Sequence, residues 1–139
     1  MKKIFLLSFL IVLSLGCKKK HFAAEGPTDV RIRNLSDLLF SNVILSTSEK
    51  QGDTLSMGNI SSGEVSDYSR FKKAYPKAEI SVMINVGGSL VKFSTGPVDY
   101  TYMQYIGQDR ITYEVYISNQ ANHVLTISNV IEEEPLVLK

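Results

Sequence analysis

Apolar and polar residues alternate with a period of two from Asp29 onward, and no stretch sustains the 3.6-residue period of a helix. The alternation is cleanest over 110–118 (RITYEVYIS), which is typical of a strand with one buried and one solvated face. Comparable short segments, rich in β-branched and aromatic residues, recur at spacings of about 8–12 residues and are separated by turn residues. We therefore expect an all-β domain.

The expected strands are 29–34, 40–47, 54–60, 65–75, 78–86, 89–95, 110–118 and 123–130. Gly87-Gly88 supplies the positive φ angles of a two-residue hairpin turn, and 119–122 (NQAN) connects the last two strands. The side chains expected to pack inward include Tyr68, Phe71, Tyr75, Ile80, Val82, Ile84, Leu90 and Phe93.

Seven to eight short strands favour an immunoglobulin-like or transthyretin-like antiparallel sandwich, with a small barrel as the alternative. The chain has one cysteine and no tryptophan, so the disulfide and tryptophan of antibody domains are missing. With no intramolecular disulfide available, the fold depends on its hydrophobic core.

Charge is distributed unevenly along the chain. The formal net charge is +1, but five of the fifteen Lys and Arg lie within the first twenty residues, ahead of all fourteen acids. Residues 21–139 therefore carry 10 − 14 = −4. A mildly acidic domain lacks the basic surface that nucleic acid requires, so we expect no nucleic-acid partner.

The first sixteen residues have the pattern of an export signal. Lys2 and Lys3 form a cationic start, and the run 4–15 (IFLLSFLIVLSL) is apolar and uncharged. A spanning helix needs about 20 apolar residues, so this twelve-residue run is too short to be one. Its length is typical of a signal peptide.

The single cysteine follows this run directly. The sequence 13–17 (LSLGC) resembles a lipobox, the site at which bacterial lipoproteins are acylated, with the small Gly16 before Cys17. The resemblance implies that the Cys17 thiol receives a diacylglycerol and that a peptidase cuts between Gly16 and Cys17. Ser14 stands where an aliphatic residue is usual, and the alternative is an ordinary secretory signal cleaved at a small-x-small site.

These features divide the chain into a signal peptide (1–16), a lipidated cysteine with a tether (17–27), a β-sandwich domain (28–131) and an acidic C-terminal tail (132–139). The whole resembles the small Bacteroidota lipoproteins that carry one sandwich domain. Among such lipoproteins, those displayed on the cell surface often carry acidic residues just after the cysteine, whereas lysines follow Cys17 here. The resemblance therefore implies the periplasmic face of the outer membrane rather than the cell surface.

The sequence holds no recognisable catalytic or metal-binding constellation. Its histidines are His21, in the tether, and His123, at a strand start, and no Gly-x-Ser-x-Gly occurs. Three or four zinc ligands at short spacing are missing. Calcium could use 132–134 (EEE), or Asp99 with Asp109, but neither set has the interleaved oxygens of a known loop. We expect no enzymatic activity, no metal and no cofactor.

The best candidate for a binding patch lies in 97–105 (PVDYTYMQY), where Tyr100, Tyr102, Met103 and Tyr105 cluster. Tyrosine offers a flat apolar face with a polar tip, which suits both sugar rings and protein partners. The competing interpretation is that alternate residues, such as Tyr100 and Tyr102, cover the sandwich core.

Together these observations predict a membrane-anchored, non-enzymatic binding or accessory module for a protein or glycan. The alternative is a structural subunit of an envelope assembly that pairs through a sheet edge. A small hydrolase or inhibitor is the third interpretation.

Overall fold

The computed structural model describes residues 26–50 and 52–133. The described residues form eight strands and no helix, and each expected strand segment overlaps one of them. In chain order the strands are β1 (Thr28–Asn34), β2 (Phe40–Ser46), β3 (Thr54–Ile60), β4 (Ser69–Phe71), β5 (Glu79–Val86), β6 (Ser89–Ser94), β7 (Arg110–Asn119) and β8 (Val124–Glu133). No helix of the described part is long and apolar enough to cross a membrane.

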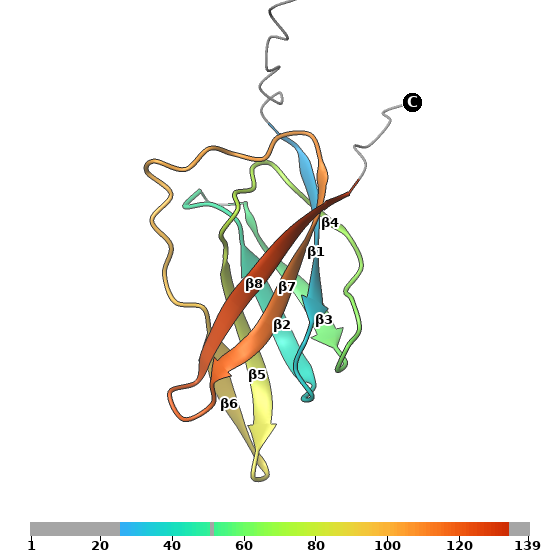
Figure 1. Ribbon diagram of the computed structural model, residues 1–139, viewed down its shortest axis with the longest axis vertical. Coiled ribbons are helices and arrows are strands. Elements are labelled where there is room, and N and C mark those ends of the chain that lie inside the picture. The colour runs from blue at the N-terminus through green and yellow to red at the C-terminus, as the bar shows by residue number, and fades with distance from the viewer. Residues whose placement is uncertain (1–25, 51, 134–139) are drawn as a thin grey trace, which may run out of the picture.

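The strands make one sheet in the order β3-β2-β5-β6-β8-β7-β1-β4, which folds over so that its two halves face each other (Figure 1). Within the halves, all neighbours are antiparallel except β1 and β7, which run parallel over six residue pairs. The halves join at one parallel pair, Ser94 with Val124. The all-β prediction is confirmed, and the architecture lies between a sandwich and a nearly closed barrel.

The core lies between the two halves and draws on both. Its largest fully buried side chains are Tyr113, Phe40, Phe71 and Phe93. The Tyr113 hydroxyl donates to the backbone oxygen of Tyr75 at 2.5 Å, so this buried polar group is satisfied. Burial raises the pKa of Tyr113 well above its ordinary range.

The Gly87-Gly88 turn forms as predicted, with φ angles of 60° and 89° joining β5 to β6. The prediction that Leu90 packs inward is wrong, because Leu90 is 58% exposed. In the register of this hairpin, Phe93 lies opposite the buried Val82, whereas Leu90 lies opposite the exposed Asn85. Since strand side chains alternate between faces, Phe93 is the inward residue.

Two strand boundaries also differ from expectation. Only Ser69–Phe71 of the expected strand 65–75 is regular, and Tyr68 and Tyr75 beside it are half-buried. At the other end of the chain, β8 continues through Glu132 and Glu133, the first two residues of the segment expected to form the acidic C-terminal tail. Glu133 is held there by side chains from β1 and β7.

Candidate functional site

The long connection 95–109 between β6 and β7 contains the tyrosine segment singled out from the sequence. Irregular connections longer than about 12–15 residues are uncommon in small domains and are usually functional. This one is fixed at both ends by backbone bonds: Thr95 N–H donates to Ile80 O at 3.0 Å and Ile106 N–H to Ala74 O at 2.8 Å. We call it the β6–β7 loop.

Tyr100 is the buried anchor of this loop. It is 9% exposed, its ring lies 5.0 Å from that of Tyr75 between centroids, and its hydroxyl donates to Ser46 O at 3.2 Å. Burial raises its pKa. Tyr100 therefore covers the end of the sandwich, in agreement with the interpretation that residues of this segment cover the core.

Tyr102 is the opposite case, with 98% of its surface exposed. The turn beneath it is ordered: Met103 N–H donates to Tyr100 O at 3.1 Å, and the Asp99 carboxylate accepts from Thr101 N–H at 3.0 Å and Thr101 Oγ1 at 2.5 Å. These bonds from Thr101 hold the pKa of Asp99 below its usual value. The loop therefore presents Tyr102 to solvent on a fixed support.

The other two members of the predicted patch point elsewhere. Tyr105 is half-buried, with the Lys73 ammonium 5.6 Å from its ring centroid. Met103 is half-buried and lines a groove on the side of the loop that faces β8. The four residues therefore have different surroundings. Tyr100 is buried, Tyr102 is exposed, Tyr105 lies near the Lys73 ammonium and Met103 lines the groove.

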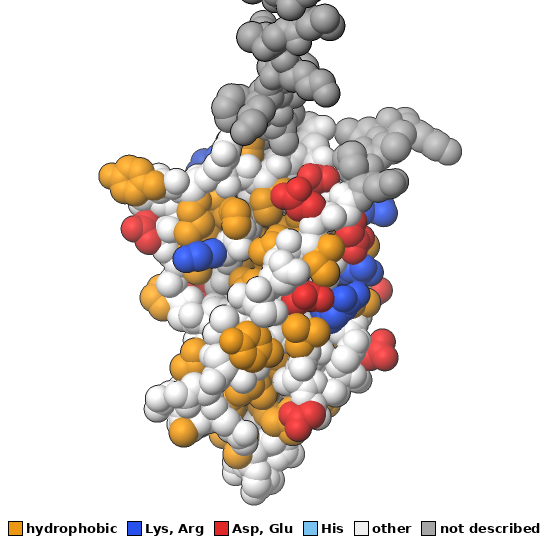
Figure 2. Space-filling model, viewed as in Figure 1, with side chains coloured by type: hydrophobic (Ala, Val, Ile, Leu, Met, Phe, Trp, Pro, Cys, Tyr) orange, Lys and Arg blue, Asp and Glu red, His pale blue; other side chains and the backbone are white. Residues whose placement is uncertain are grey.

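The groove has a volume of about 390 Å³, within the range of small-ligand and peptide pockets. Pro97, Val98 and Met103 form its loop wall, and Leu125 and Ile127 of β8 form the other. Lys77, Asp99 and Thr126 contribute charged and polar groups. Figure 2 shows apolar side chains gathered on this face of the molecule.

The groove forms where pairing between the two halves stops. After the Ser94–Val124 pair, no described strand pairs with the side of β8 that faces away from β7. Leu125, Thr126 and Ile127, which follow that pair in β8, border the groove. No local signal in the sequence indicates this arrangement, because Leu125 and Ile127 lie twenty or more residues from the tyrosine segment.

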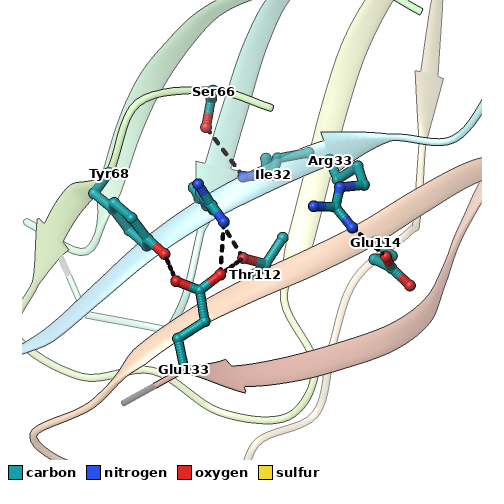
Figure 3. A network of polar contacts seen from close by, with 8 residues as sticks. Ile32, Arg33, Ser66, Tyr68, Thr112, Glu114 and Glu133 are labelled. Atoms are coloured by element: carbon teal, nitrogen blue, oxygen red, sulfur yellow. Dashed lines mark hydrogen bonds and ion pairs between the residues drawn. The ribbon is translucent and has the colours of Figure 1, made fainter. Parts of the chain in front are cut away.

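A polar network covers the outer face of the β8-β7-β1 layer (Figure 3). Glu133 accepts from Arg31 at 2.6 Å and from Thr112 at 3.1 Å, and the Tyr68 hydroxyl donates to its second oxygen. The Arg31 guanidinium carbon lies 4.7 Å and that of Arg110 lies 5.2 Å from the Tyr68 ring centroid.

The network shifts the protonation of its members. The Tyr68 bond, followed by those of Thr112 and Arg31, lowers the pKa of Glu133. Burial and the contact with Glu133 raise the pKa of Tyr68. Sequence reasoning missed this cluster, since its residues come from four distant segments. Its contacts join strands, so we interpret it as part of the fold.

The histidine that the structure describes lies in a turn at the surface. His123 is exposed in the turn before β8, with a φ of 57°, and its ring meets that of Phe93 edge-on at 4.9 Å. No three His, Cys, Asp or Glu side chains in the described residues are grouped to hold a metal. Cys17, His21 and Glu134 lie outside the described residues.

Comparison with known proteins supports the fold alone. No family model matches the chain, and no curated protein matches it. Among solved structures, the chain is similar to a protein from Eubacterium rectale determined by NMR, with a TM-score of 0.51 and 16% identity over 82% of this chain and 96% of the other. At that identity the likeness concerns the all-β architecture.

Proposed function

We propose that this chain is a lipid-anchored, non-enzymatic binding module of the cell envelope, which holds a protein or glycan partner in the groove between the β6–β7 loop and β8. The observation that carries the proposal is the pairing of an ordered, exposed loop with an adjoining apolar groove. Loops held by a rigid scaffold are the usual place for binding residues. The lipobox-like 13–17 (LSLGC) supports the anchor.

The groove combines features that suit recognition. Leu125 and Ile127 stand on a strand that pairs with β7, opposite Ile117 and Val115, while Met103 brings a flexible apolar side chain from the loop. Lys77 and Asp99 place one charge of each sign in the lining. Apolar walls with a few fixed polar groups are typical of ligand pockets.

Site-specific photocrosslinking in intact cells tests the proposal. A photoreactive residue at Met103 of the full-length chain should yield a discrete adduct, and the same residue at Ser62, in the turn after β3, serves as the control. Val98→Lys, which places a charge in the loop wall of the groove, should abolish the Met103 adduct. Equal adducts from both positions, or an adduct that survives Val98→Lys, would contradict binding in the groove.

The unpaired side of β8 favours a second candidate, a structural subunit whose partner adds a strand there. An extended segment paired with an open edge gains affinity from main-chain hydrogen bonds. This candidate predicts co-purification with one protein at a constant ratio through repeated washes. Exchange of the bound partner on dilution would instead support the binding module.

We place the module on the periplasmic face of the outer membrane, because lysines follow Cys17. Protease treatment of intact cells should then leave the domain whole until the outer membrane is permeabilised. Digestion in intact cells, with a periplasmic control protein preserved, would place it on the surface and move the search for partners to extracellular glycans and proteins.

A further inference from the structure

The β6–β7 loop runs along one side of the domain and finishes at the end where β1 begins (Figure 1). Thr28, the first residue of β1, donates from its hydroxyl to Gly107 O, and Asp29 N–H donates to Asp109 O at 2.9 Å. Thus the last residues of the loop are bonded directly to the first residues of the domain. Tyr102 lies on this loop five residues before Gly107, and the neighbouring Tyr100 is bonded to Ser46 at the end of β2.

The length of the tether limits how far this end can lie from the lipid. Ten residues, 18–27, separate Cys17 from the start of β1, and a fully extended chain of that length reaches at most ~35 Å. A short link of this kind keeps the linked surface at high effective concentration near the bilayer. The opposite end of the domain is a further strand length away.

We propose that Tyr102 and the turn around it contact the lipid headgroup layer, so that the domain stands on the membrane with its tether end down. Tyrosine is enriched at membrane–water interfaces, where its apolar ring and polar hydroxyl are both accommodated. Tyr102 is 98% exposed and no packing contact in the described residues accounts for an aromatic there. This inference rests on acylation of Cys17 and is independent of any partner in the groove.

The contact depends on the ring rather than on charge. Exposed residues of both signs occur in the loop and in the segments near it, among them Lys50, Lys72, Glu49 and Asp99. For these four residues, attraction to anionic lipid is offset by repulsion. The contact made by the Tyr102 ring should therefore form on zwitterionic phosphatidylcholine vesicles as well as on vesicles that contain anionic lipid.

Spin-label accessibility on the full-length, acylated protein in phosphatidylcholine vesicles tests this directly. Cys17 is the chain's one cysteine and its thiol is blocked by the thioether to diacylglycerol, so Gln104→Cys supplies one labelling site beside Tyr102. Ala121→Cys, in the exposed turn at the far end, is the matched control. We expect collisions with a water-soluble nickel chelate to be severalfold fewer at 104 than at 121.

Adding Tyr102→Ser to the Gln104→Cys protein should return the 104 label to the accessibility of the 121 control. Equal exposure of both labels with Tyr102 intact, or protection at 104 that persists with serine, would overturn the proposal. Vesicle flotation distinguishes failure of the lipid anchor from failure of the Tyr102 contact. Protein that fails to float refutes the lipid anchor itself, whereas protein that floats with an exposed 104 label refutes the membrane contact alone.

Discussion

Two tyrosine-containing regions of this domain differ in what their side chains do. Tyr68 meets two guanidinium groups with its ring and Glu133 with its hydroxyl, and so ties β1, β7 and β8 together. Tyr102, on the β6–β7 loop, is almost fully exposed. Contacts within the fold account for the first tyrosine. They do not account for the second, which is why we assign contact with an outside surface to it.

The largest expected effect lies at the base of the loop. Tyr100→Ala removes a ring packed on Tyr75 and a hydroxyl bonded to Ser46 O, and it leaves a cavity at the end of the sandwich. We expect the free energy of unfolding to fall by about 3 kcal/mol, as for other buried aromatic truncations. Denaturant unfolding measures it, and Tyr100→Phe, which keeps the ring, should lose only about 1 kcal/mol. Equal losses in both variants would show that the ring does not anchor the loop.

The network on the sheet face should show a smaller loss. Glu133→Gln removes the charge that Arg31, Thr112 and Tyr68 share, at a half-buried position. We expect about 1 kcal/mol of destabilisation by thermal or chemical unfolding. Glu132→Gln, one residue earlier and exposed, is the control and should change little. A neutral Glu133→Gln would mean that the network does not hold the strands.

The same network predicts a dependence on pH. Because the folded-state pKa of Glu133 is lowered, its contribution is fully present above the unfolded value of about 4.3 and is lost as pH falls from there through the lower folded value. The stability of the wild-type protein should therefore fall more steeply across this acidic range than that of Glu133→Gln. Parallel curves for the two proteins would contradict the assigned pKa direction.

The smallest expected effect on stability is at the loop tip. Tyr102→Ala should change the free energy of unfolding by less than about 0.5 kcal/mol, because an exposed side chain contributes little packing. Comparing its free energy of unfolding with that of Tyr100→Ala gives the difference in stability between the exposed and the buried tyrosine. A loss above about 1 kcal/mol at Tyr102 would give it a structural role and remove the reason to assign it a contact.

The strands and the hairpin turn were predictable from sequence, because period-two patterning and Gly87-Gly88 are local signals. The order of the strands was not, because β1 pairs with β7 across roughly eighty residues and the Arg31–Glu133 bond spans 102. The sequence singles out the tyrosine segment as a candidate, but only the fold separates buried Tyr100 from exposed Tyr102. Both lie in an irregular loop, where alternation carries no information about facing.

The central claim, that this domain acts from a lipid anchor, is tested most directly by metabolic labelling with a fatty acid. Full-length wild-type protein should incorporate the label and fractionate with membranes. Cys17→Ala should do neither. Ser14→Ala, at the position where a lipobox usually has an aliphatic residue, should still be labelled. Loss of labelling on removal of the one thiol would establish the anchor. Fatty-acid incorporation that persists in Cys17→Ala, or an unlabelled wild-type protein, would contradict the account.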